Sequence, residues 1–192
     1  MVRKRNWRPN AYYHVIMRGN NRESIFKTPE DMYHMLRIIS HAHEKFHFSM
    51  AAFCIMTNHY HFLIKSEDEL SRIMSHINRR YSDYYSRRYN HVGRIYQQRY
   101  HPILIESPQG ALAVSRYIHR NPIKTKLPMV NDLADYPFSS FPVYASRQTN
   151  KWRFLDTKTL LSYMHPPSEG TIQEYADYCL AKLAKDEEKV RS

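Results

Sequence analysis

Glycine, cysteine and acidic side chains are all scarce in this chain. Its 192 residues include four glycines, two cysteines and 18 acidic residues against 29 Lys and Arg, which gives a formal net charge of +11. Cys54 and Cys179 match no disulfide or metal spacing, which favours free thiols in a reducing cytosol. The longest stretch without Asp, Glu, Lys or Arg, residues 46–64, carries His, Asn and Ser, so no membrane span is expected. No apolar run follows the basic residues 1–9, so no secretory leader is expected either.

Basic and aromatic side chains are abundant and are mixed along the chain. The sequence holds 16 tyrosines, and arginines and tyrosines are interleaved rather than grouped in blocks. Such mixing is typical of nucleic-acid-binding surfaces, where cations meet phosphates and rings stack on bases. A basic protein with a merely solvated surface is the plainer alternative. A chain of this length can form one domain with its own core and an extension.

The segment 48–66 combines two short apolar runs with a turn at residues 57–58. Thr and Asn favour a turn, so we expect a β-hairpin whose second strand begins at His59. Side chains at i and i+2 of a strand share a face, so His59 and His61 point the same way and can hold a divalent metal. A chance pair is common in a chain with 12 histidines, and residues 41–43 contain a second His-x-His. That second pair lies in a helical pattern, where i and i+2 do not face each other, so only the first stays a candidate.

Helix and strand signals give the whole chain a regular order. The predicted elements are a strand at Tyr12–Met17, a helix from Pro29 to Phe46, the hairpin, a helix with a capping box from Ser66 to Glu69, a strand at Ile103–Ile105, a helix at Pro108–Arg120 and a last helix capped by Thr171. The order β-α-β-β-α-β-α predicts a ferredoxin-like α+β fold, an antiparallel sheet with helices on one side. Six of the ten prolines lie at residue 122 or beyond. We therefore predict a core at residues 1–122 and a C-terminal extension at residues 123–192 that packs on the core and ends in a helix.

Three further features are candidates for function. Residues 18–22, Arg-Gly-Asn-Asn-Arg, form a turn whose amides and guanidinium groups can contact phosphates or base edges, although a solvated loop is an equally good interpretation. Arg79 and Arg80 lie on the predicted second helix, where acids are scarce, which favours a polyanionic partner. Tyr117 and Asn121 are i and i+4 at the end of the third helix, on one side of its last turn. Such a pair, taken alone, is usually structural.

Several motifs occur together in a fixed order. They are Arg18-Gly19-Asn20-Asn21-Arg22, Met56-Thr57-Asn58-His59-Tyr60-His61, Tyr96-Gln97-Gln98-Arg99-Tyr100, Arg116-Tyr117-Ile118-His119-Arg120-Asn121-Pro122 and Asp135-Tyr136-Pro137-Phe138-Ser139-Ser140. From about Tyr12 to Ser140 the chain thus closely resembles the REP-associated tyrosine transposases, a branch of the single-tyrosine HUH transposases. Two departures are visible, because Tyr60 stands where an aliphatic residue is usual and Thr57 stands where the family has Pro. Neither position is a metal ligand.

The resemblance implies an HUH endonuclease core that cleaves and rejoins single-stranded DNA. Family members bind hairpins formed by repetitive extragenic palindromes and nick near a short guide tetranucleotide. Carried over residue by residue, Tyr117 is the nucleophile that forms a 5′-phosphotyrosine, and His59, His61 and Asn121 hold a divalent metal, Mg²⁺ or Mn²⁺. The candidate DNA-binding residues, from the turn, the second helix and the Tyr-Gln-Gln-Arg-Tyr motif, are Arg18, Asn20, Asn21, Arg22, Arg79, Arg80, Gln98 and Arg99.

Two alternative functions remain beside this interpretation. The first is a sequence-specific protein that binds hairpin DNA without cutting it, which the joint presence of the nucleophile and the ligands disfavours. The second is another HUH nickase, such as a plasmid relaxase or a replication initiator, which the short chain and the lack of a helicase-like extension disfavour. We expect a bacterial, cytoplasmic, chromosome-associated protein whose partner is single-stranded or hairpin DNA and not a membrane. The sequence leaves open whether it is a monomer or a homodimer.

Overall fold

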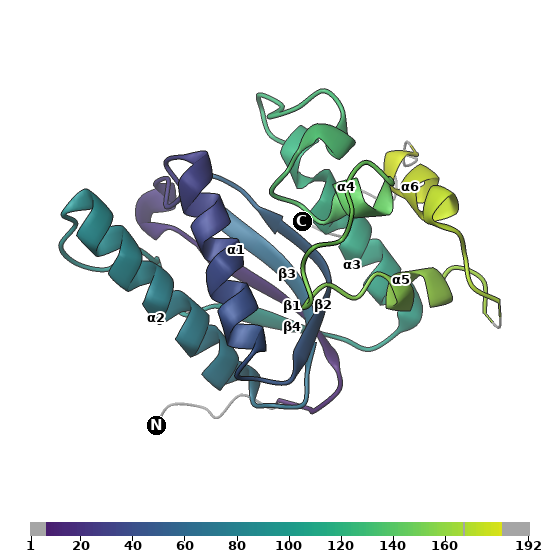
Figure 1. Ribbon diagram of the computed structural model, residues 1–192, viewed down its shortest axis with the longest axis horizontal. Helices are drawn as coiled ribbons and strands as arrows, with labels where there is room; N and C mark the ends of the chain where they lie inside the picture. Colours follow the sequence, from purple (N-terminus) through teal and green to yellow (C-terminus); the bar gives the residue numbers. More distant parts are fainter. Residues whose placement is uncertain (1–6, 167, 182–192) are drawn as a thin grey trace.

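The computed structural model describes residues 7–166 and 168–181, and its centre is a four-stranded antiparallel sheet (Figure 1). The strands are β1 (Tyr12–Arg18), β2 (Phe48–Ile55), β3 (His59–Ser66) and β4 (His101–Ile105), in the spatial order β2-β3-β1-β4. Three helices alternate with them, α1 (Pro29–His43), α2 (Leu70–Tyr89) and α3 (Pro108–Arg120). The predicted α+β fold of ferredoxin-like order is confirmed.

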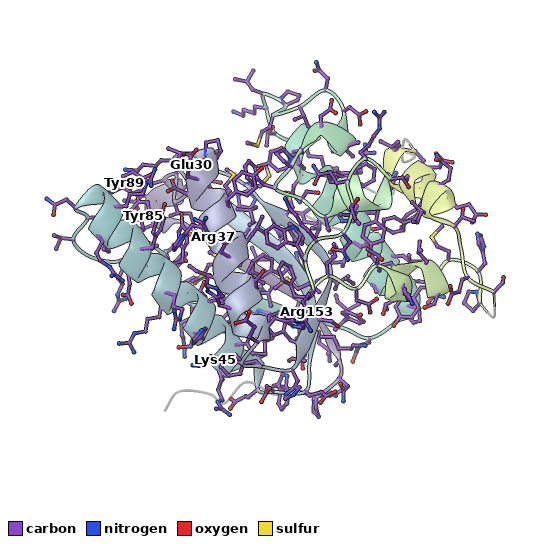
Figure 2. All side chains as sticks on the ribbon, viewed as in Figure 1. Glu30, Arg37, Lys45, Tyr85, Tyr89 and Arg153 are labelled. Atoms are coloured by element: carbon purple, nitrogen blue, oxygen red, sulfur yellow. The ribbon has the colours of Figure 1, made fainter. Side chains whose placement is uncertain are left out.

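Different helices cover the two faces of the sheet. The hydroxyl of Tyr60 donates to Asn78 of α2 at 2.6 Å, whereas the neighbouring His61 contacts Tyr117 of α3, with 5.4 Å between ring centroids. Figure 1 shows α1 and α2 on one side of the sheet and α3 with the later helices on the other, and side chains crowd both spaces (Figure 2). The expectation of helices on one side therefore holds for α1 and α2 but is wrong for α3. Because both faces are covered, β2 and β3 are nearly continuous apolar runs.

The start of α2 also differs from the expectation of a capping box at Ser66. Ser66 is the last residue of β3, where it pairs with Phe48, and it is buried. The helix begins four residues later, and its N-cap residue Glu69 accepts a hydrogen bond from the Ser71 hydroxyl at 2.7 Å. The strand ladder thus occupies the residue that the local motif would have used as a cap.

The described part of the C-terminal extension covers the outer edge of β2. The Ile55 amide donates to the Phe138 carbonyl at 2.8 Å, and the Ser140 amide donates to the Phe53 carbonyl at 3.0 Å. Its described residues contain the short helices α4 (Phe141–Tyr144) and α5 (Lys158–Ser162), and the last helix among them is α6 (Ile172–Leu180). An open sheet edge exposes unpaired amides and carbonyls, so these contacts satisfy the outer edge of β2. Residues 182–192 of the predicted extension lie outside the described residues.

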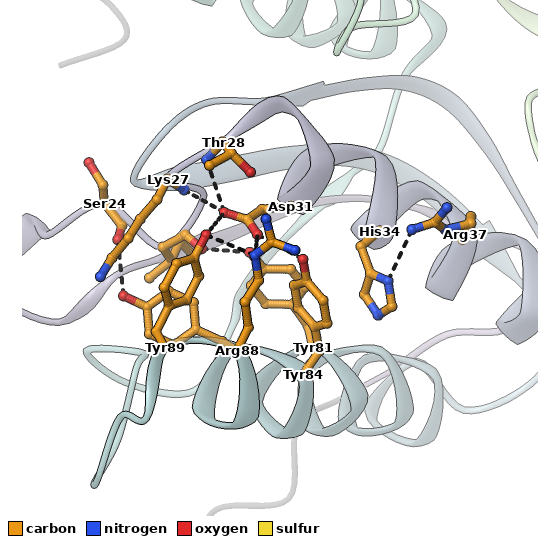
Figure 3. Close-up of polar contacts among 12 residues, drawn as sticks. Ser24, Lys27, Thr28, Asp31, His34, Arg37, Tyr81, Tyr84, Arg88 and Tyr89 are labelled. Atoms are coloured by element: carbon orange, nitrogen blue, oxygen red, sulfur yellow. Dashed lines mark hydrogen bonds and ion pairs between the residues drawn. The ribbon is translucent and has the colours of Figure 1, made fainter.

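A buried carboxylate ties α1 to the C-terminal half of α2 (Figure 3). Asp31 is fully buried and accepts hydrogen bonds from the Lys27 amide at 2.8 Å, the Tyr84 hydroxyl at 2.8 Å and the Tyr89 hydroxyl at 2.6 Å. Nε of Arg88 lies 3.3 Å from the same carboxylate. Burial raises the pKa of Asp31, but the hydrogen bonds outweigh it and the net pKa is lowered. The carboxylate is therefore charged and stabilises the packing of these two helices.

We expect Asp31→Asn to lower the free energy of unfolding by about 2 kcal/mol at neutral pH, because an amide leaves some of these donors unpaired. The pKa of Asp31 is lower in the folded state than in the unfolded state, where it is about 3.9, so the stabilisation is present above that pH and declines as the pH falls through it. Urea unfolding at neutral pH and at about pH 3 should show the difference shrinking in acid. Asp83→Asn, which neutralises an exposed acid of α2, is the control and should change stability by less than about 0.5 kcal/mol. If both variants are equally stable at neutral pH, the carboxylate does not hold these helices together.

Candidate active site

The register between β1 and β3 gathers polar side chains on one face of the sheet. Partners in an antiparallel ladder share a face, and the register pairs Arg18 with His59 and Ile16 with His61. His14 lies two residues from Ile16 and therefore on the same face. The rings of His59 and His61 are 5.0 Å apart between centroids, which agrees with their predicted i and i+2 arrangement.

The last turn of α3 lies over these histidines. The ring centroid of Tyr117 is 5.4 Å from that of His61 and 5.9 Å from that of His14. Asn121 follows directly after the helix, where its Nδ2 donates to the Tyr117 carbonyl at 2.9 Å and its side chain contacts His59. The fold thus brings together the predicted nucleophile and all three predicted metal ligands.

His14 belongs to this group, although the motifs of the sequence did not identify it. Its Nε2 lies 2.9 Å from Nδ1 of His61, within hydrogen-bonding distance. A single histidine within an apolar strand usually belongs to the core, and only the register of β1 against β3 brings it to His61. The sequence carries only a weak signal for this position. His14 lies four residues before Arg18, so both side chains lie on the same face of the strand, and Arg18 begins the turn that is predicted to bind DNA.

Burial keeps these imidazoles neutral. It lowers the pKa of His14 and of His59 to about 4, and it lowers the pKa of His61 well below its usual value. The positive charge of Arg18 lowers the pKa of His59 further, whereas contact with Asn121 raises it. A neutral imidazole offers a lone pair to a metal without first losing a proton.

The hydrogen bonds around the histidines leave lone pairs that suit a cation. Nδ1 of His59 lies 2.6 Å from Oδ1 of Asn58, so this nitrogen carries the proton and Nε2 keeps a lone pair. Nδ2 of Asn121 is held by helix carbonyls, which leaves its Oδ1 for the His59 ring. In the His14–His61 pair, the tautomer with its proton on Nδ1 of His61 would leave a lone pair on Nε2 of His61 as well. Outer partners that orient each ring in this way are usual around metals.

The predicted third ligand of such a site is the amide oxygen of Asn121. Among the described residues, no three or more His, Cys, Asp and Glu side chains are grouped so that they could hold a metal ion. Two imidazoles and one amide oxygen are a weaker set than three histidines, and they leave positions open for phosphate oxygens and water.

Residues 8–121 match the model of a protein family described as "Transposase IS200 like". The chain belongs to this family. A solved structure described as a REP-associated tyrosine transposase bound to a REP hairpin is similar to this transposase, with a TM-score of 0.63 and 21% identity over 77% of this chain and 86% of that chain. At this identity the similarity establishes the shared fold. Both findings confirm the resemblance that the motifs indicated, whereas no curated protein sequence is significantly similar.

In this transposase the Arg18–Arg22 turn adjoins the histidines. The Gly19 amide donates to the Asn58 carbonyl at 2.8 Å, and Nδ2 of Asn58 donates to the Arg22 carbonyl at 3.0 Å. A Cβ on Gly19 would lie 2.4 Å from the Glu23 carbonyl oxygen, so the tight turn requires glycine. The side chains of the turn are exposed, and they are Arg18, Asn20, Asn21 and Arg22. The turn is thus fixed by its backbone while its polar side chains face solvent.

The other predicted DNA-binding residues lie elsewhere on the transposase. Arg79, Gln98 and Arg99 line an open cavity of about 790 Å³ between α2 and residues 94–100, on the side of the sheet away from the histidines. The two regions are joined, because the Gln97 amide donates to the Arg18 carbonyl at 3.1 Å. Arg80 is exposed on α2 and does not line this cavity.

Every helix within the described ranges is too short or too polar to span a lipid bilayer.

Proposed function

We propose that this chain is a metal-dependent transposase that binds hairpins of palindromic DNA and that cleaves and rejoins single strands through Tyr117. The observation that supports this proposal most is the meeting of Tyr117 with His61, and of Asn121 with His59, on one face of the sheet. A tyrosine hydroxyl beside a cation site is the arrangement that nucleophilic attack on a phosphodiester requires. Membership of a transposase family agrees with this chemistry.

In the proposed reaction the hydroxyl oxygen of Tyr117 loses its proton and attacks the scissile phosphorus. The bond between phosphorus and the 3′ oxygen breaks, and that oxygen takes up a proton. The products are a 5′-phosphotyrosine and a free 3′-OH, so the number of phosphate ester bonds is unchanged. A 3′-OH can therefore attack the phosphotyrosine and rejoin the strand without ATP. The hydrogen bond from Asn121 to the Tyr117 carbonyl fixes the nucleophile relative to the ligands.

His59, His61 and Asn121 are the residues that would hold Mg²⁺ or Mn²⁺. Nitrogen donors suit Mn²⁺ better than Mg²⁺. A bound divalent cation would neutralise the phosphate charge and orient the scissile group. Nζ of Lys124 lies 6.0 Å from the ring centroid of Tyr117, so this residue adds positive charge beside the nucleophile.

The DNA is proposed to contact two connected surfaces. The Arg18–Arg22 turn reads the guide tetranucleotide, because its exposed amides and guanidinium groups lie next to His59. Arg79, Gln98 and Arg99 in the cavity, with Arg80 outside it, contact the hairpin. The similar structure is described as bound to a REP hairpin, which supports a hairpin as the ligand here. Such a protein would act on chromosomal DNA in the bacterial cytoplasm. Because one chain supplies Tyr117 and all the proposed ligands, the proposed chemistry needs no second subunit.

The proposal predicts that Tyr117→Phe abolishes cleavage of hairpin oligonucleotides and formation of a covalent adduct, because it removes only the attacking oxygen. Hairpin affinity should change by less than about threefold, since no phosphate-binding cation is lost. Gel analysis of both products in Mn²⁺ and in Mg²⁺ measures this, with Tyr33→Phe, which alters an exposed tyrosine of α1, as the matched control. An adduct that still forms with Tyr117→Phe would place the nucleophile elsewhere. A wild-type protein that binds hairpins but never cleaves them with any divalent metal would favour the alternative of a non-cleaving binding protein.

The hydrogen bond between His14 and His61 predicts an effect on metal affinity. His14→Phe keeps a ring in place but removes the nitrogen that orients His61, so we expect the dissociation constant for Mn²⁺ to rise by about 10–100-fold. Titration calorimetry with MnCl₂ measures this directly, without DNA. His41→Ala removes an exposed histidine of the discarded His-x-His pair and should leave the affinity unchanged. Equal affinities in the two variants would show that His14 does not support the site.

The position of the turn predicts a role for Arg22 in both affinity and sequence preference. Arg22→Ala should weaken hairpin binding and reduce the slope of log affinity against log salt by about 1, which is the signature of one lost phosphate contact. It should also relax the choice of tetranucleotide among hairpins that differ only at the guide. Arg37→Ala, on the exposed side of α1, is the control. Unchanged affinity together with unchanged preference for Arg22→Ala would exclude the turn from the interface.

A further inference from the structure

The side of α3 that faces away from the histidines is held by the C-terminal extension. Tyr117 and His119 are two residues apart, so their side chains leave the helix about 160° apart. Tyr117 meets the histidines of the sheet, whereas His119 is fully buried among residues of the extension. Ser115 and Arg116 are also buried, with 0% and 2% of their surfaces exposed. The helix that carries the proposed nucleophile therefore lies between the active site and the extension.

A directed series of hydrogen bonds connects α3 to α6. The Ser115 hydroxyl donates to the Leu112 carbonyl at 2.8 Å, so it accepts from the Tyr175 hydroxyl, which lies 2.8 Å away. The Tyr175 proton is thereby used, so Nδ1 of His119, 3.0 Å from the same hydroxyl, has to be the donor in that contact. Tyr175 is fully buried and belongs to α6. Its hydroxyl thus joins two side chains of α3, one helical turn apart.

The series continues from α3 to the strand beside the active site. With its proton on Nδ1, His119 accepts at Nε2 from the Ser140 hydroxyl at 2.7 Å. The oxygen of Ser140 in turn accepts from the Phe53 amide of β2 at 3.0 Å. Both ring nitrogens of His119 therefore have partners, and all of these partners, including Sγ of Cys179 at 3.9 Å from Nδ1, come from the extension. A buried network of this kind fixes one arrangement, because each unpaired alternative leaves a polar atom without a hydrogen bond.

Two arginines on α3 make a second connection to α6. The guanidinium of Arg120 donates to the carbonyl of Cys179 at 2.7 Å, and that of Arg116 donates to the carbonyl of Ala181. The last carbonyls of a helix have no partners within the helix, so these arginines satisfy the C-terminal end of α6. The contacts flank Tyr117 on both sides along α3. A shift or rotation of the helix would break them together with the contacts of His119.

We propose that His119 and Tyr175 are positioning residues for the strand-cleavage step, through which the extension sets the rotation and position of α3 and thereby of the Tyr117 hydroxyl. This inference rests on the proposed function of Tyr117. Neither residue touches the DNA or the metal ligands in this account. A displacement of the nucleophile by about 1 Å is enough to slow a reaction roughly 100-fold. Loss of one hydroxyl in the network therefore acts on the rate of cleavage rather than on binding.

Tyr175→Phe and Tyr144→Phe form a matched pair that tests this. Each removes one hydroxyl from a fully buried tyrosine of the extension and keeps the ring beside His119. The Tyr144 hydroxyl, however, donates to the Ala51 carbonyl of β2 at 2.8 Å and not to α3. Single-turnover cleavage at saturating hairpin and Mn²⁺ should fall about 10–100-fold in Tyr175→Phe and less than about twofold in Tyr144→Phe. Hairpin affinity should be unchanged in both, and unfolding temperatures measured in parallel should be lowered to a similar extent.

A readout that does not depend on cleavage separates this inference from the proposed function. Incorporation of 3-fluorotyrosine at position 117 gives a ¹⁹F resonance that reports the surroundings of that ring. We expect the resonance to shift or broaden in Tyr175→Phe and to stay in place in Tyr144→Phe. If the wild-type protein does not cleave but the resonance behaves in this way, the proposed function fails and the positioning of α3 stands. Equal cleavage rates in the two variants, or an unmoved resonance in Tyr175→Phe, would overturn the positioning role.

Discussion

The pairing register of β1 against β3 is the constraint on which the rest of the structure depends. It sets Arg18 opposite His59 and brings His14 within reach of His61, on the face that α3 covers. A slip of one residue would turn every side chain of a strand to the other face and would present Tyr60 to α3 in place of the histidines. The opposite face resists such a slip, because Tyr60 is fully buried against α2 and donates to Asn78. The packing of Tyr60 against α2, on the opposite face of the sheet, therefore fixes the position of the polar site.

Placing α3 on the histidine face has a structural cost that the extension offsets. The helix carries buried polar groups at Ser115, Arg116 and His119, each of which needs a partner where water is absent. Ser140, Tyr175 and the carbonyl of Ala181, the C-cap residue of α6, provide these partners. The same extension pairs with the outer edge of β2, so it braces the sheet and the helix that meet at the candidate active site. The described part of the extension is thus connected to the candidate site through hydrogen bonds, although the predicted ligands and nucleophile all lie outside it.

Local patterns in the sequence predicted what depends on local geometry. The shared face of His59 and His61 follows from strand periodicity, and the proximity of Asn121 to Tyr117 follows from helix periodicity. The sequence motifs indicated the transposase family, which strand and helix periodicity do not reveal. Features that depend on distant pairing were missed or wrong. His14 required the β1–β3 register, and the ladder between Ser66 and Phe48 displaced the predicted cap. The separation of Arg79 and Arg99 from the histidines required knowledge of which helix covers which face.

The most direct test of the account is to identify the amino acid that becomes linked to DNA. Wild-type protein is incubated with a hairpin oligonucleotide and Mn²⁺, digested with protease and nuclease, and analysed by tandem mass spectrometry. We expect a single modified peptide that carries a nucleotide joined through its 5′ phosphate to the oxygen of Tyr117. Attachment to another residue, or cleavage of the hairpin with no protein–DNA linkage, would contradict it.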